Sequence, residues 1–384
     1  MKLAFVVLTG FSLVTAGCVR PIDLHSNDLP VAAVGGVGCG GSAMAQRALA
    51  ATPPSFAAGA ASVPRVPKAV FYSAPSQEDS TATALYVVNR DGSQRREIIH
   101  GFFDANDPVV SPDGTLVAFI RQSASLEHAR LMVAGVDGGN LRMLYRSADY
   151  VNSVSWSPDS RRIAFLADGR VRTIGRDGDR PAVPIAEIHD DIADVETSAV
   201  AWSPDGGTIA FTDGGWVNGH WLGLPMLTIV APDGSRRREL VTTTGYFAWS
   251  PRGDALAFTN RGISIVQVGG GKLRHLVATP EGTVVGSLSW SPDGGSIVFQ
   301  SGDLDVVDLC RVSADGTTLT QLATCMPNNS GYDLSSDGQA VVFIQSTGPD
   351  CDHSPDSRIV VVPLNGGPMS VLAQEGRSPQ WLGG

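Results

Sequence analysis

The chain has 384 residues, which is enough for one large domain or two of ordinary size. Its formal net charge of −10 argues against nucleic acid as a partner, because phosphate binding requires a basic surface. Only 17% of the residues are charged and 44 are glycine, a composition that favours an all-β domain with many turns.

The N-terminus has the pattern of an export signal. Lys2 is followed by an apolar run over residues 3–14 and then by small residues before Cys18. This pattern predicts a signal peptide at residues 1–17, and the run is shorter than the ~20 apolar residues needed to span a bilayer. The segment 13–18 (LVTAGC) resembles the bacterial lipoprotein signal, although Thr15 stands where leucine is usual. The resemblance implies that Cys18 is acylated and anchors the chain to a membrane. An ordinary secretory signal is the alternative.

Residues 18–66 are predicted to form a flexible tether, because they are rich in alanine, glycine, proline and serine and contain one aromatic residue, Phe56. Within them, residues 36–41 (GVGCGG) match a dinucleotide-binding fingerprint. That fingerprint requires a complete βαβ unit with an acidic residue on its second strand, and nothing downstream provides one.

One motif recurs through the rest of the chain. It consists of an apolar strand that usually ends in Trp, a Ser-Pro-Asp-Gly turn, and a second strand that ends in Ala-Phe or Val-Phe. The copies cover residues 109–119, 155–165, 201–211, 248–258, 289–299 and 333–343, and a seventh at 379–381 stops before its turn. The Trp positions are 41 to 47 residues apart, which is the length of one four-stranded β-propeller blade.

The two ends of the repeat region predict how the ring closes. Residues 68–100 provide three strands with no Trp-turn unit before them, and residues 377–382 provide one strand with no others after it. We therefore predict an all-β, seven-bladed β-propeller at residues 67–384, closed by the C-terminal strand joining the first blade. A six-bladed ring is the alternative if the N-terminal strands are irregular. Blades are numbered 1 to 7 from this shared blade.

The repeat resembles the TolB-type propeller repeat, which is related to WD repeats, over about 315 of the 384 residues. The resemblance implies a propeller in the cell envelope. TolB-like proteins carry an α/β domain before the propeller, whereas this chain has the tether of residues 18–66 in that place.

Enzymatic motifs are absent from the sequence, which contains no G-x-S-x-G, H-E-x-x-H or C-x-x-C pattern. We assign the repeated Trp residues to packing between blades and the turn Asp residues to caps of their own turns. We therefore expect no catalytic residues, no metal centre and no cofactor.

The longest loops lie on one face of the predicted ring. The connections between the second and third strands are long in blades 1, 2, 4 and 7, and they share a face, here called the top, with the loops that link consecutive blades. These top loops are acidic, with Glu78, Asp79, Asp190, Asp191, Asp350 and Asp352 as candidate binding residues. They could attract a basic partner or hold Ca²⁺, or they could be ordinary solvated loops.

The long loop of blade 4 contains Trp216, His220 and Trp221 between glycines. Exposed aromatic side chains suit a protein or glycan surface, and the alternative is local packing over the blade.

The cysteines are consistent with an oxidising compartment. Cys325 follows the last strand of blade 6 and Cys351 lies in the long loop of blade 7, so both belong to the top of neighbouring blades. We predict that they form a disulfide.

Together these features predict an envelope lipoprotein, periplasmic or at the outer surface, whose monomeric propeller is a non-catalytic scaffold. Its acidic top face would bind envelope proteins, and the acyl chains on Cys18 would bind the membrane. The alternative is a propeller that binds or cleaves cell-wall or extracellular polysaccharide.

Overall fold

The computed structural model describes a defined part of the chain. The described residues are 32–33, 69–75, 83–102, 105–122, 129–147, 150–188, 199–214, 216–217, 220–221, 225–271, 273–280, 283–303, 306–327, 331–347 and 357–382. All of them belong to the unit formed by residues 31–384. The predicted signal peptide, Cys18 and most of the tether lie outside the described residues. Within the described ranges, no helix is long and apolar enough to cross a membrane.

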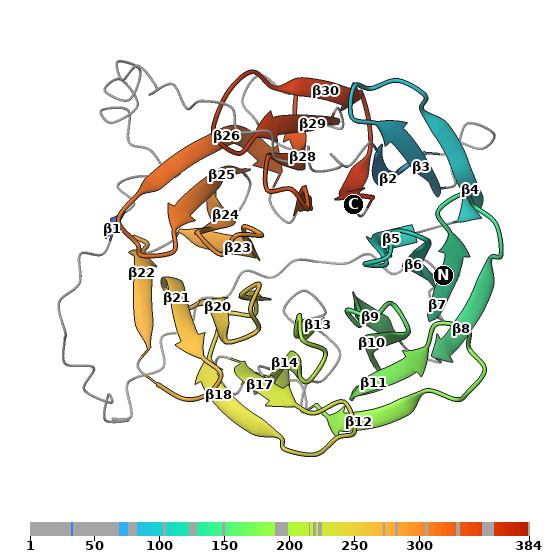
Figure 1. Ribbon diagram of the computed structural model, residues 1–384, viewed down its shortest axis with the longest axis horizontal. Coiled ribbons are helices and arrows are strands. Elements are labelled where there is room, and N and C mark those ends of the chain that lie inside the picture. The colour runs from blue at the N-terminus through green and yellow to red at the C-terminus, as the bar shows by residue number, and fades with distance from the viewer. Residues whose placement is uncertain are drawn as a thin grey trace, which may run out of the picture. The chain divides into compact units, whose positions relative to one another are not determined.

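Seven four-stranded antiparallel sheets form the ring, as predicted (Figure 1). From the centre outward, the strands of each sheet are called a to d. In blade order the strands are β31 (Arg377–Trp381), β2 (Ala69–Pro75), β3 (Thr83–Asn89), β4 (Arg96–Phe102); β5 (Ala105–Val110), β6 (Leu116–Gln122), β7 (Ala129–Gly135), β8 (Arg142–Ser147); β9 (Val151–Trp156), β10 (Arg162–Ala167), β11 (Arg170–Gly175), β12 (Val183–Glu187); β13 (Val200–Trp202), β14 (Ile209–Asp213), β17 (Met226–Val230), β18 (Arg238–Thr242); β19 (Phe247–Trp249), β20 (Ala255–Thr259), β21 (Gly262–Gln267), β22 (Arg274–Ala278); β23 (Val284–Trp290), β24 (Ser296–Gly302), β25 (Val306–Ser313), β26 (Leu319–Pro327); β27 (Tyr332–Leu334), β28 (Ala340–Ser346), β29 (Ser357–Pro363) and β30 (Ser370–Ala373).

The ring closes through blade 1, where the last strand β31 pairs with the first propeller strand β2. Val70 pairs with Trp381 and Ser73 with Arg377, with a register shift between them, and the Ser73 hydroxyl donates to the Arg377 carbonyl at 3.3 Å. This confirms the predicted closure. In addition, a two-residue strand, β1 (Ala32–Ala33), pairs in parallel with the outer strand of blade 5.

The a–b turns have the local structure that their sequence predicts. In blade 4, Asp205 Oδ1 accepts hydrogen bonds from the Ser203 hydroxyl at 2.5 Å and from the Gly207 N–H at 2.9 Å. These two donors lower the pKa of Asp205. Gly206 has a φ of +72°, which glycine adopts without the steric cost of a Cβ, and a Cβ there would lie 3.7 Å from Pro158 of the previous turn. Neighbouring a–b turns therefore touch one another on the bottom face.

The hydrophobic core lies between the blades. Seven clusters of buried residues each span two neighbouring sheets, so every blade packs against the blades on both sides. The repeated Phe residues lie within strand b of their blades and have no exposed surface; they are Phe119, Phe165, Phe211, Phe258, Phe299 and Phe343. The indole N–H groups of four Trp residues donate to backbone carbonyls of the preceding blade at 2.9 to 3.2 Å, and these are Trp156, Trp249, Trp290 and Trp381. This confirms that the Trp residues join blades.

Candidate functional site

Most of the predicted top-face residues lie outside the part of the chain that the structure describes. This holds for Glu78, Asp79, Asp190, Asp191, Asp350 and Asp352, and also for Cys18 and Cys351. Their proposed roles in partner or Ca²⁺ binding therefore stay predictions. Among the described residues, no group of three or more His, Cys, Asp or Glu side chains could hold a metal ion.

The long loop of blade 4 contains secondary structure that the sequence did not predict. Strands β15 (Trp216–Val217) and β16 (His220–Trp221) form a small antiparallel hairpin between strands b and c of that blade. The register pairs Trp216 with Trp221 and Val217 with His220. The three residues predicted to bind a partner therefore belong to one paired element instead of an irregular loop.

The structure describes two of the cysteines, and both are disulfide-bonded. Cys310 is fully buried within β25, and Cys325 lies near the end of β26 with a φ of +64°. Participation of Cys325 in a disulfide agrees with the prediction, and its pairing with Cys351 stays a prediction. Participation of Cys310 was not expected, because its place within a strand gave no indication of a partner.

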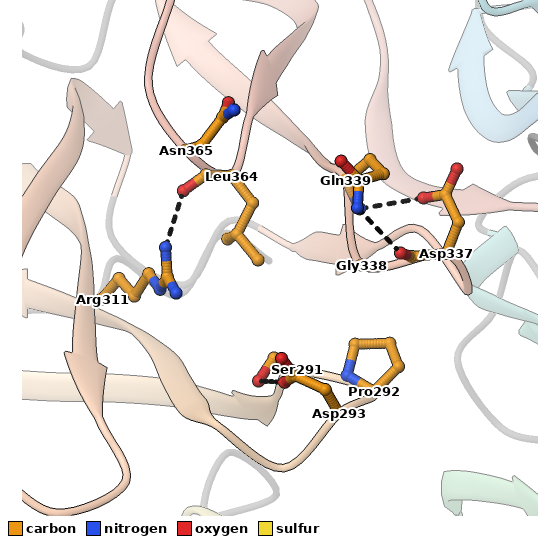
Figure 2. Close-up of a pocket in the computed structure, with 9 residues that line it drawn as sticks. All are labelled: Ser291, Pro292, Asp293, Arg311, Asp337, Gly338, Gln339, Leu364 and Asn365. Atoms are coloured by element: carbon orange, nitrogen blue, oxygen red, sulfur yellow. Dashed lines mark hydrogen bonds between the residues drawn. The ribbon is translucent and has the colours of Figure 1, made fainter. Parts of the chain in front are cut away.

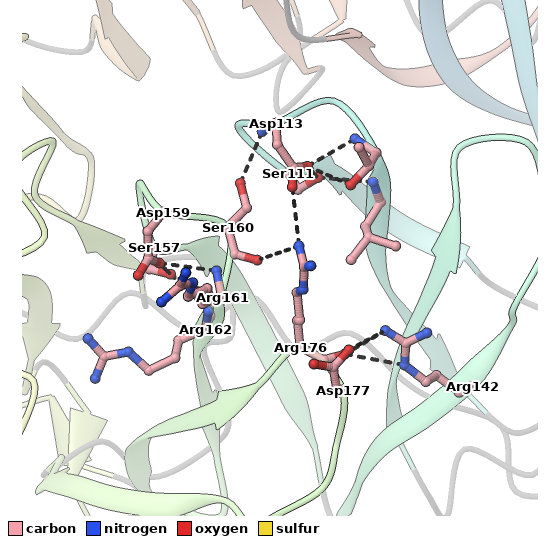
Figure 3. A network of polar contacts seen from close by, with 12 residues as sticks. Ser111, Asp113, Arg142, Ser157, Asp159, Ser160, Arg161, Arg162, Arg176 and Asp177 are labelled. Atoms are coloured by element: carbon pink, nitrogen blue, oxygen red, sulfur yellow. Dashed lines mark hydrogen bonds and ion pairs between the residues drawn. The ribbon is translucent and has the colours of Figure 1, made fainter.

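The bottom face carries an arginine network between blades 2 and 3 (Figure 3). Arg176 is the first residue after strand c of blade 3. Its Nη1 lies 3.2 Å from Oδ2 of Asp113 in blade 2 and 3.4 Å from the carbonyl oxygen of Ser160 in blade 3. Arg142 of blade 2 donates to the Arg176 carbonyl at 2.7 Å and forms an ion pair with Asp177 at 3.6 Å. The two arginines thus link neighbouring blades at separate points: the Arg176 guanidinium contacts the a–b turns, and the Arg142 guanidinium contacts the backbone after strand c.

A polar pocket occupies the corresponding place between blades 6 and 7 (Figure 2). Its volume is about 360 Å³, and the a–b turns of the two blades (291–293 and 337–339) form two of its sides. Arg311, Leu364 and Asn365 complete the lining, and Arg311 Nη1 donates to the Leu364 carbonyl at 3.2 Å. Asp293 Oδ1 accepts from the Ser291 hydroxyl at 2.6 Å and the Gly295 N–H at 2.9 Å, which leaves Oδ2 for another partner.

A titratable carboxyl lies at the interface between blades 7 and 1. Asp333 Oδ2 accepts the backbone N–H of Trp381 at 2.8 Å, and the indole of Trp381 donates to the Asp333 carbonyl at 3.1 Å. Desolvation raises the pKa of the Asp333 carboxyl to about 7, although the Trp381 N–H acts in the opposite direction. Burial raises the pKa of the neighbouring Tyr332 phenol, and the charge of Asp333 acts in the same direction. Asp333 therefore belongs to the closure of the ring.

Comparisons with known proteins agree on the fold. No model of a known protein family matches the chain, and no curated protein matches it either. Among solved structures, the chain is similar to TolB from Acinetobacter baumannii, with a TM-score of 0.52 and 17% identity over 79% of each chain. It is also similar to the β-propeller domain of the Trilobed protease from Pyrococcus furiosus (TM-score 0.54, 15% identity, 80% of this chain and 92% of that one).

A third similar structure is an oligogalacturonate lyase in complex with manganese, with a TM-score of 0.53 and 14% identity over 79% of this chain and 84% of that one. At these identities the similarity shows the fold alone. The chain is thus a seven-bladed β-propeller. Its structure resembles TolB as well as propellers of enzymes.

Proposed function

We propose that this propeller is a non-catalytic scaffold of the bacterial envelope. It is held to a membrane through acylated Cys18, and its acidic top face binds a protein partner. The observation that supports this most is the paired hairpin β15–β16 in the long loop of blade 4. A backbone pairing holds Trp216 and Trp221 opposite each other, and Trp is among the residues that contribute most to protein interfaces.

The difference between the acidic residues of the two faces supports the same proposal. The described turn aspartates of the bottom face, such as Asp205 and Asp293, accept hydrogen bonds from their own turns. These hydrogen bonds stabilise the turns, so at least one oxygen of each carboxylate has a structural role. The acidic residues of the top loops stand outside the repeat, so they are free to differ from blade to blade as a binding surface requires.

Crosslinking in intact cells tests the proposal. The double variant Trp216→Ala/Trp221→Ala should lose a crosslinked protein that the unchanged chain retains. Met143→Ala/Val183→Ala is the matched control, because these side chains are 52% and 56% exposed on outer strands β8 and β12. Identical crosslinked products for all three chains would contradict the proposal. Cys18→Ser should move the protein from the membrane fraction to the soluble fraction.

Glycan binding or cleavage is the second candidate function, because a pair of Trp residues on a hairpin also suits stacking against sugar rings. Affinity electrophoresis in gels containing cell-wall or extracellular polysaccharide distinguishes the two. Retardation that depends on Trp216 and Trp221, without a crosslinked protein, would favour the glycan.

A further inference from the structure

Because the blades are repeats, the pocket between blades 6 and 7 can be compared with the equivalent place between blades 2 and 3. Leu364 and Arg176 hold equivalent places, since each is the first residue after strand c. Each also donates its backbone N–H at 2.9 Å to the carbonyl just before strand b, that of Gln339 and Arg161 respectively. Between blades 2 and 3 this place carries a guanidinium group (Figure 3). Between blades 6 and 7 it carries the shorter apolar side chain of Leu364, which lines an open pocket (Figure 2).

The groups that bind the guanidinium of Arg176 have counterparts in the pocket. Arg176 contacts the carboxylate of Asp113 and the carbonyl of Ser160. In the repeat, Asp293 occupies the position of Asp113, and Gly338 occupies the position of Ser160. Both counterparts line the pocket. The acceptors of a guanidinium site are therefore present without the arginine that fills it elsewhere.

Arg311 does not exclude a second cation. From strand c of blade 6 it donates to the Leu364 carbonyl and not to a carboxylate of the pocket. The Ser291 hydroxyl is the main cause of the lowered pKa of Asp293, and the charge of Arg311 adds to this effect from a greater distance. Arg311 is further held by the Ser296 hydroxyl at 3.0 Å. With Asp293 and Asp337, the lining carries two negative charges and one positive charge, that is −2 + 1 = −1, so a cationic guest brings it to neutrality.

We propose that this pocket on the bottom face binds the guanidinium group of an arginine side chain presented by a protein partner. A planar guanidinium matches a carboxylate and a carbonyl acceptor better than a compact ammonium does. The pocket volume of about 360 Å³ lies at the small end of the ~300–1,000 Å³ range of ligand sites, as a single side chain requires. The site is on the opposite face from the proposed top-face surface and does not depend on it.

Titration of the purified full chain by NMR tests this site, with N-acetyl-arginine methylamide as the probe. We expect saturable binding in the millimolar range, about 1–10 mM. The citrulline analogue, which is neutral and of the same shape, should bind at least about tenfold more weakly, and the lysine analogue should also bind more weakly. Free L-arginine should bind no more tightly than the blocked probe, because a negatively charged pocket does not attract its α-carboxylate.

Three variants locate the binding. Asp293→Asn should weaken it about tenfold while its Oδ1 keeps the turn hydrogen bonds. Leu364→Arg should abolish it, because the new side chain fills the site as Arg176 does. Asp205→Asn, the same turn position in blade 4, is the control and should leave affinity unchanged, and melting temperatures show whether each variant folds.

Several results would overturn the assignment. They are equal affinity for the arginine and citrulline probes, no binding at 50-fold the expected dissociation constant, unchanged binding by a folded Leu364→Arg chain, or equal losses for Asp293→Asn and Asp205→Asn. Tighter binding of free L-arginine than of the blocked probe would overturn the assignment to a protein partner.

Discussion

Asp333 links the closure of the ring to pH. Its carboxyl has a pKa of about 7 in the folded protein, raised by desolvation from the ordinary value of 3.8. Between these two values the folded state holds a proton that the unfolded chain has lost. The stability that the protonated carboxyl contributes is therefore complete below pH 3.8 and is lost as the pH rises through about 7. The closing interface between blades 7 and 1 should weaken over this window.

The variant Asp333→Asn should remove this dependence, because an amide is neutral at every pH and its oxygen can still accept the Trp381 N–H. The difference between 3.8 and about 7 corresponds to about 4 kcal/mol. Because the Asp333 side chain keeps partial exposure, we expect roughly half of this, ~2 kcal/mol. That change corresponds to about 4 °C in melting temperature.

Thermal unfolding followed by circular dichroism at pH 5 and at pH 8 measures the effect. This range covers about 2 of the roughly 3 pKa units between 3.8 and about 7, so the melting temperature of Asp333→Asn relative to the unchanged chain should rise by about 2.5 °C between these two pH values. Asp205→Asn is the control. Hydrogen bonds from Ser203 and Gly207 lower the pKa of Asp205, so its difference from the unchanged chain should stay constant over this range. An equally constant difference for Asp333→Asn would refute the reasoning.

Other predictions concern single contacts. Gly376→Ala should lower the melting temperature by several degrees, because its Cβ would lie 2.6 Å from Tyr72 Cδ2 at a φ of +141°, and a loss smaller than 1 °C would contradict this. Ser160→Gly should change stability by less than about 1 kcal/mol in urea unfolding, because relief of its φ of +58° offsets the loss of a hydrogen bond to the neighbouring turn. Peptide mapping without reductant should recover Cys325 linked to Cys351, and a free thiol at Cys351 would disprove this pairing.

The fold was predictable because its determinants are local and repeated. Six of the seven blades carry a Ser-Pro-Asp-Gly turn or a close variant of it, and most have a Trp whose indole joins the blade to the previous one. Closure also followed from the sequence, because three strands at one end and one at the other complete a single sheet.

The pocket between blades 6 and 7 was not predictable in the same way. The pocket exists because blade 7 has Leu364 at the position that Arg176 occupies in blade 3. The equivalence of these two positions is recognised from their backbone hydrogen bonds. The raised pKa of Asp333 likewise depends on its burial against Trp381, 48 residues away. The hairpin β15–β16 escaped prediction because strands of two residues are too short for a periodic pattern.

The pairing of β31 with β2 has a consequence for biosynthesis. The inner strand of the first sheet is the last part of the propeller to leave the ribosome, so the sheets of blades 2 to 6 can assemble before the first sheet has its inner strand. Completion of the ring must therefore follow translation of Trp381. A ribosome stalled before that residue should display a nascent chain in which blade 1 is accessible to protease while blades 2 to 6 are protected.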